Sequence, residues 1–170
     1  MPKPSELIVL ATVAAGAGGG AAIDMWTRRV PNPLTALVAA TGVLLAAYGV
    51  SGITVGASLA GLLIGLALML PGYLIGATGA GDVKLFAALG SLLGPMPIAT
   101  AFFYTALAGG VMALVVALLR RRLRHTLSGT ARLIVSASEA APAIENPLEN
   151  NRFAYAPAIA VGTMLAALGL

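Results

Sequence analysis

Four long stretches of the chain contain no charged residue. They cover residues 7–23, 30–81, 85–119 and 153–170. A helix needs about 20 apolar residues to cross the hydrocarbon layer of a membrane, so the second stretch is long enough for two crossings. Because these stretches are continuously apolar, without alternation of apolar and polar residues, they favour helices over the strands of a membrane barrel. The pattern predicts a bundle of membrane helices, in which each helix pairs its own backbone groups.

Prolines and glycines divide the apolar stretches into six predicted helices. Proline lacks a backbone donor and glycine favours turns, so breaks are expected at residues 31–33, 49–52, 76–81 and 94–97. The fourth helix, from about residue 82, has roughly 13 residues and a rise of about 20 Å, too short to cross alone. It is expected either to be a half-span shielded by its neighbours or to be extended by loop residues. The predicted helices cover about residues 5–28, 34–48, 54–75, 82–93, 98–119 and 153–170.

Composition agrees with a lipid environment. Hydrophobic residues make up 59% of the 170 residues and charged residues only 9%, against about 25% charged residues in a soluble domain. We therefore expect residues 1–170 to form one all-α integral-membrane domain in contact with membrane lipid, with a cytoplasmic loop at about residues 120–152. The chain has no cysteine and no cluster with metal-ligand spacing, so neither a metal nor another cofactor is predicted.

The basic residues predict the orientation of the bundle. They follow the first, third and fifth predicted helices and precede the sixth, at Arg28, Arg29, Lys84, Arg120, Arg121, Arg122, Arg124 and Arg152. With six crossings these positions share one side of the membrane, which the positive-inside rule makes cytoplasmic. Both termini are then predicted outside. The net charge of +4 is interpreted as this topology signal and not as a nucleic-acid site.

Three ionisable residues lie within or beside the apolar stretches: Asp24, Asp82 and Lys84. Such residues are costly in a membrane and are functional candidates. Each residue could also have a purely structural role. Asp24 lies four residues before Arg28, the spacing of an ion pair on a helix. Asp82 could cap the start of a helix, and the Lys84 side chain could extend to the membrane interface. The predicted topology nevertheless places both aspartates at similar depth near the cytoplasmic face.

Two neighbouring carboxyl groups have a defined chemistry. Because two neighbouring negative charges repel each other, the two groups do not both ionise and they share one proton. The ionised group accepts a proton from water while the protonated group polarises a peptide carbonyl. This arrangement produces a tetrahedral intermediate without a covalent enzyme adduct, as in an aspartic protease.

Two motifs resemble those of the type IV prepilin peptidases, which are GxGD membrane aspartic proteases. Residues 79–84 read Gly-Ala-Gly-Asp-Val-Lys, which is similar to the GxGDxK motif around one catalytic aspartate of that family. Residues 24–32, Asp-Met-Trp-Thr-Arg-Arg-Val-Pro-Asn, resemble the first-aspartate segment, in which a basic residue and Ile/Val-Pro-Asn follow the acid. The resemblance covers about residues 5–119 well and the last predicted helix more loosely.

The resemblance implies a membrane endopeptidase that removes the leader from prepilin or pseudopilin precursors at the cytoplasmic face of a bacterial or archaeal membrane. It implies Asp24 and Asp82 as the catalytic pair, with the remaining motif positions in support: Gly79, Gly81, Lys84, Arg28, Pro31 and Asn32. The chain lacks the two CxxC pairs associated with N-methylation in larger members, so no N-methyltransferase activity is expected. In size it resembles the short peptidases of tight-adherence (Flp) pili, and the archaeal-type preflagellin peptidases are comparably compact.

Other functions remain open from the residues. A proton- or ion-coupled transporter would use Asp24 and Asp82 as a relay, and predicts an internal repeat with acids near the membrane midplane. A non-catalytic assembly subunit predicts that neither aspartate is needed. A membrane aspartic protease of the signal-peptide-peptidase kind leaves the segment 30–32 and Lys84 unexplained. The oligomeric state is not determined by the sequence.

Overall fold

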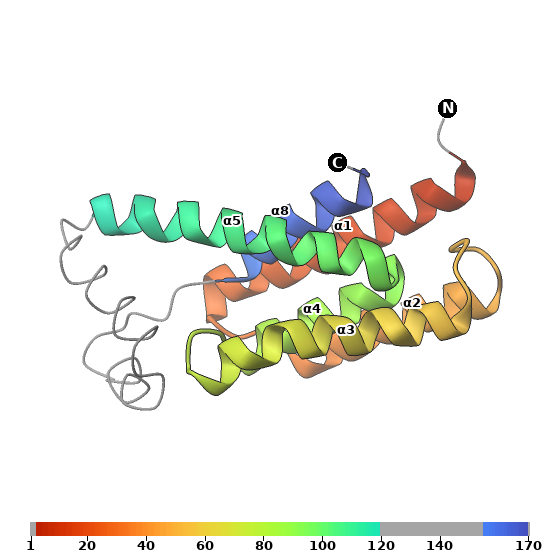
Figure 1. Cartoon of the computed structure of the whole chain (residues 1–170), viewed down its shortest axis with the longest axis horizontal. Coiled ribbons are helices and arrows are strands. Elements are labelled where there is room, and N and C mark those ends of the chain that lie inside the picture. Colours follow the sequence, from red (N-terminus) through yellow and green to blue (C-terminus); the bar gives the residue numbers. More distant parts are fainter. Residues whose placement is uncertain (1–2, 120–154, 170) are drawn as a thin grey trace.

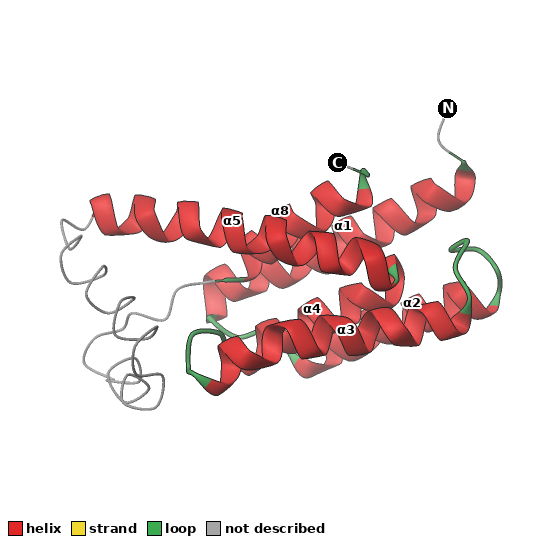
Figure 2. Ribbon diagram, in the orientation of Figure 1, coloured by secondary structure: helices red, strands yellow, loops and turns green. Residues whose placement is uncertain are grey.

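The computed structural model describes residues 3–119 and 155–169. Six helices make up this part of the chain, and it contains no strand (Figure 2). The prediction of an all-α bundle with six helices is therefore confirmed. The helices are α1 (Pro4–Thr27), α2 (Asn32–Ala47), α3 (Val55–Leu74), α4 (Ala80–Leu93), α5 (Pro95–Leu119) and α8 (Ala156–Ala167).

The helix boundaries differ from the prediction mainly at prolines. Helix α5 begins at Pro95 and contains Pro97, so it starts three residues earlier than predicted. Proline is tolerated in a first turn because the first backbone N–H groups of a helix have no partner within it. The last helix, α8, is shorter than predicted. The predicted loop at residues 120–152 lies outside the described residues.

The helices form two groups of three (Figure 1). Helix α8 contacts α1 and α5 in one group, and α4 contacts α2 and α3 in the other. Helix α4 also contacts α1, α5 and α8, so it touches every other described helix. Each group thus has a short inner helix, of 12 residues in α8 and 14 in α4.

Helix α4 is the centre of the hydrophobic core. Every residue from Leu85 to Leu93 is buried, and Leu85, Phe86 and Leu89 are fully enclosed. Phe102 of α5 packs edge-on against Phe86, with 6.3 Å between ring centroids. Of the two options for the short fourth helix, shielding by its neighbours is what the structure shows, and the helix begins only two residues earlier than predicted, at Ala80.

Glycines allow both inner helices to approach a neighbour backbone to backbone. A Cβ atom on Gly61 of α3 would lie 2.8 Å from the Cα of Gly94, at the end of α4. A Cβ atom on Gly162 of α8 would lie 2.5 Å from the backbone nitrogen of Thr105 in α5. Such close contacts between small residues are a main source of helix association in membranes.

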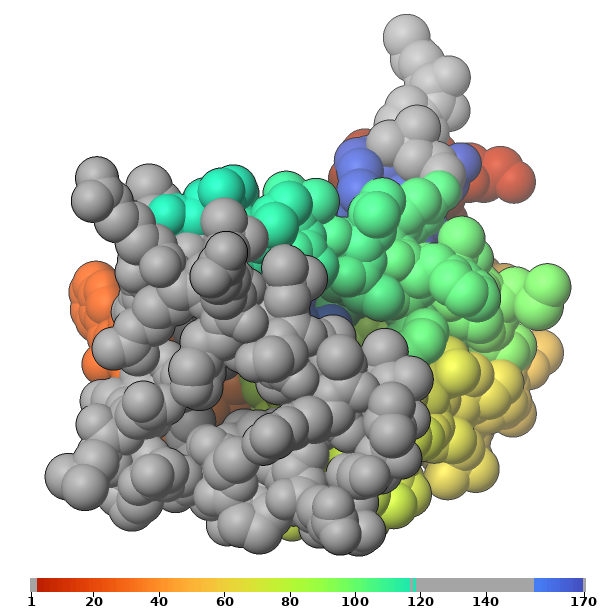
Figure 3. Space-filling view, turned by 60° about the vertical axis from the view of Figure 1, so that its left-hand side comes forward, coloured from red at the N-terminus to blue at the C-terminus, as the bar shows by residue number. Residues whose placement is uncertain are grey.

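The outer surface of the bundle is apolar. Three helical segments are long and apolar enough to cross a membrane: Pro4–Thr27, Val55–Leu74 and Pro95–Val116. Helices α3 and α5 lie side by side on one face (Figure 3). Both helices expose large apolar side chains, among them Leu63 and Leu107. An apolar surface of this kind fits a lipid environment, because contact with lipid carries no free-energy cost for apolar side chains.

Candidate active site

Asp24 and Asp82 come from different helices and lie at one end of the bundle. Asp24 is in the last turn of α1, and Asp82 is the third residue of α4. Figure 1 shows the end of α1 and the starts of α4 and α8 at this same end. Both aspartates are buried, with 5% and 7% of their surface exposed. The helices that carry them, α1 and α4, are in contact.

Each carboxyl group accepts a hydrogen bond from the start of a short helix. The Gly79 N–H, at the N-cap of α4, donates to Asp82 Oδ2 over 3.2 Å. The Ala156 N–H, at the first residue of α8, donates to Asp24 Oδ2 over 3.4 Å. The first N–H groups of a helix have no partner within it and carry partial positive charge, so they suit a carboxylate. Both inner helices therefore fix one aspartate each.

The second oxygen of Asp82 has no protein partner in the described part of the chain. Asp82 Oδ1 is buried and makes no hydrogen bond there. A buried acceptor without a partner costs about 1–3 kcal/mol, and such groups are rare in native proteins. This oxygen is thus positioned to accept a hydrogen bond from a water or a bound peptide.

The two sequence motifs are in direct contact. Lys84 Nζ, on the exposed side of α4, donates to Asn32 Oδ1 over 2.9 Å. One residue before Asp82, the α4 backbone approaches the α1–α2 connection: a Cβ atom on Gly81 would lie 3.1 Å from the backbone nitrogen of Val30. Lys84 therefore has a specific partner in the other motif, which the sequence did not predict.

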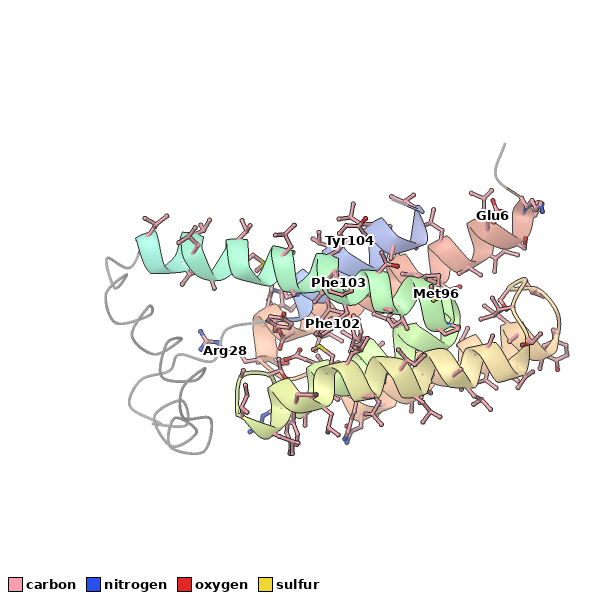
Figure 4. All side chains as sticks on the ribbon, viewed as in Figure 1. Glu6, Arg28, Met96, Phe102, Phe103 and Tyr104 are labelled. Atoms are coloured by element: carbon pink, nitrogen blue, oxygen red, sulfur yellow. The ribbon has the colours of Figure 1, made fainter. Side chains whose placement is uncertain are left out.

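The remaining motif residues shape the ends of the helices. Arg28 ends α1 in a left-handed conformation (φ 53°), and its N–H donates to the Asp24 carbonyl over 2.8 Å. Its side chain points away from the bundle (Figure 4), and its positive charge acts on Asp24 one turn earlier. Pro31 is the N-cap of α2. Gly79 has a φ of −79°, and a Cβ atom there would lie 3.1 Å from Asp82 Oδ2.

Sequence reasoning missed the contribution of α8. Neither Tyr155 nor Ala156 was among the predicted site residues. The structure places the Ala156 N–H against Asp24, next to the half-buried Tyr155. A backbone donor has no side-chain signature, so nothing in the sequence marks Ala156. Within residues 3–119 and 155–169, no group of His, Asp and Glu is arranged to hold a metal ion.

Comparison with known proteins gives one result for the chain. The model of the type IV leader peptidase family matches residues 8–114, which is more than half of the 170 residues. The matched region contains both aspartates and both motifs, and it ends before α8. No curated protein and no solved structure matches the chain significantly.

Proposed function

Because the chain belongs to the type IV leader peptidase family, we propose that it is an aspartic endopeptidase that removes the leader peptide from prepilin or pseudopilin precursors. Family membership identifies it as a leader peptidase-type protease, and its apolar helices identify it as a membrane protein. The proposal adds the catalytic residues, the class of substrate and the face of the membrane.

Asp24 and Asp82 are the proposed catalytic pair. In this mechanism the ionised carboxylate accepts a proton from water as the water oxygen forms a bond to the scissile carbonyl carbon. The protonated carboxyl group donates its hydrogen bond to the carbonyl oxygen. The tetrahedral intermediate then breaks at the C–N bond, and the leaving nitrogen takes a proton from the pair.

The observation that carries this proposal is that two buried aspartates, from the contacting helices α1 and α4, lie at one end of the bundle. Each Oδ2 accepts a hydrogen bond from a backbone N–H group. These bonds fix both side chains, while Asp82 Oδ1 has no partner in the described part of the chain. A fixed pair with an available acceptor meets the geometric need of water activation, because positioned groups need no reorganisation during the reaction.

The cytoplasmic face is the proposed location of this site. Arg28, Arg29 and Lys84 lie at the end of the bundle that carries Asp24 and Asp82, and basic residues favour the cytoplasmic side. We extend the proposal to one domain over residues 1–170, with residues 120–152 as a cytoplasmic loop and both termini outside. A chain without cysteine also leads us to propose a peptidase without N-methyltransferase activity, of the short tight-adherence type.

The transporter alternative gains no support from the geometry. It requires acids near the membrane midplane, whereas Asp24 lies three residues before the end of α1 and Asp82 is the third residue of α4. We therefore retain the peptidase as the single proposed function.

A cleavage assay on the purified protein tests the proposal. A prepilin-like precursor with a basic leader and an apolar helix is incubated with wild type, Asp24→Asn and Asp82→Asn in detergent. Asparagine keeps the size of the side chain and removes its titratable group. We expect wild type to remove the leader and both variants to lose activity by ~10³-fold or more, while their helical content and thermal midpoint match wild type. Near-normal cleavage by either folded variant contradicts the assignment of that residue.

A further inference from the structure

The start of α8 lies outside the region matched by the family, yet it contacts the site. The match ends at residue 114, and α8 begins at Ala156. The Ala156 N–H donates to Asp24 Oδ2, which places the preceding residue, Tyr155, beside the pair. Helix α8 also contacts α4, which carries Asp82. The question is what the Tyr155 side chain does there.

The Tyr155 ring is held by a glycine of α5. A Cβ atom on Gly109 would lie 2.7 Å from Tyr155 Cε2 and 3.0 Å from its hydroxyl oxygen. Only a glycine leaves room for the ring at this position. A Cβ atom on the adjacent Gly110 would meet nothing within 4 Å. The close fit to the ring is therefore specific to Gly109. The ring therefore has a fixed place against α5.

The Tyr155 hydroxyl is available for a ligand. It makes no hydrogen bond to any residue in the described part of the chain, and it belongs to the residue next to Ala156, whose N–H donates to Asp24. Asp82 Oδ1 is buried and also has no partner among those residues. An unused donor on a half-buried tyrosine and an unused buried acceptor on Asp82 can both be satisfied by the reacting atoms of a peptide and a water.

We propose that Tyr155 is a third catalytic residue, whose hydroxyl donates a hydrogen bond to the carbonyl oxygen of the scissile peptide. This inference rests on the proposed aspartic mechanism. As water adds to the carbonyl carbon, the π electrons move to the carbonyl oxygen. The Tyr155 hydroxyl and the protonated aspartate both donate to that oxygen, and Tyr155 keeps its proton throughout. A donor aimed at developing negative charge stabilises the transition state more than the bound substrate.

The test compares Tyr155→Phe, Gly109→Ala and Gly110→Ala with wild type in the precursor cleavage assay. Phenylalanine keeps the ring against Gly109 and removes only the hydroxyl. We expect Tyr155→Phe to lower kcat by ~10- to 100-fold while KM and the thermal midpoint stay within error of wild type. We expect Gly109→Ala, which displaces the ring, to lower kcat as well. Gly110→Ala, with the same change one residue along, should retain wild-type kcat.

A transition-state mimic separates catalysis from packing. A precursor peptide whose scissile amide is replaced by a hydroxyethylene group should bind Tyr155→Phe more weakly than it binds wild type. The loss of affinity should be about the factor lost in kcat/KM. Uncleaved substrate should bind both proteins alike. Normal kcat in Tyr155→Phe overturns the inference even if Gly109→Ala is impaired, because the ring and not the hydroxyl would then matter. If wild type itself fails to cleave, or equals Asp82→Asn, the proposed function fails instead.

Discussion

The two short inner helices fix their aspartates in the same way, but only one of them is visible in the sequence. Helix α4 carries Asp82 and binds it through the Gly79 N–H at its own start. Helix α8 carries no acid, and its first N–H group binds Asp24 from α1. The comparison shows that a site can be built from two similar helix starts when only one has a recognisable motif.

The family match follows the same division. It includes α4 and ends before α8. Helix α8 and the residue before it contribute a backbone donor and a tyrosine held by Gly109. If the two helices are equivalent parts of the site, damage to either should have comparable consequences. The following predictions test that equivalence.

The largest effect is expected where the inner helices touch their neighbours through glycine. Gly61→Ala should separate α3 from α4, and Gly162→Ala should separate α5 from α8, because each new Cβ atom would meet backbone atoms. Each should lower the free energy of unfolding by about 1–3 kcal/mol, measured by thermal unfolding in detergent. Gly56→Ala is the control, since its Cβ atom would lie 3.9 Å from the nearest atom. If Gly162→Ala is as stable as wild type while Gly61→Ala is destabilised, the two glycine contacts are not equivalent.

A smaller effect is expected at the contact between the two motifs. Gly81→Ala adds a Cβ atom 3.1 Å from both the Cβ and the backbone nitrogen of Val30, so the start of α4 must shift and carry Asp82 with it. We expect kcat/KM for precursor cleavage to fall about tenfold, because small displacements of reacting groups are costly. Gly19→Ala, which meets nothing within 4 Å, should be normal. Unchanged cleavage by Gly81→Ala would show that this approach does not position Asp82.

The smallest effect is expected at the exposed Lys84–Asn32 hydrogen bond. Lys84→Met and Asn32→Leu should each lower kcat/KM about fivefold, and the double variant should lose little more, which corresponds to a coupling of about 1 kcal/mol. Lys3→Met controls for the loss of a lysine elsewhere. Additive losses would mean that the two residues act separately, with Lys84 serving only to reach the membrane interface.

Much of the fold could be predicted because its signals are strong and local. The apolar stretches, prolines and glycines predicted six helices and the shielded position of α4. Boundaries shifted where a proline, such as Pro95, is accepted inside a first turn. The choice of helix neighbours is carried by single glycines such as Gly162, whose partner atoms are backbone and leave no pattern in the sequence.

The candidate site was predictable only in part, for the same reason. Asp24 and Asp82 were found because acids are rare in apolar stretches. The Lys84–Asn32 bond joins residues 52 positions apart, and no periodicity connects them. Ala156 acts through its backbone, and Tyr155 was one of several aromatic residues near a predicted helix end. Contacts of this kind require the folded chain.

The most direct test of the central account is a double-mutant cycle of precursor cleavage with Asp24→Asn, Asp82→Asn and the combined variant. Residues that act as one catalytic unit have strongly non-additive effects. We predict that each single variant loses ~10³-fold or more in kcat, and that the double variant is no slower than either one. Retained activity in one single variant, or losses that multiply in the double variant, would contradict a shared site built from α1 and α4.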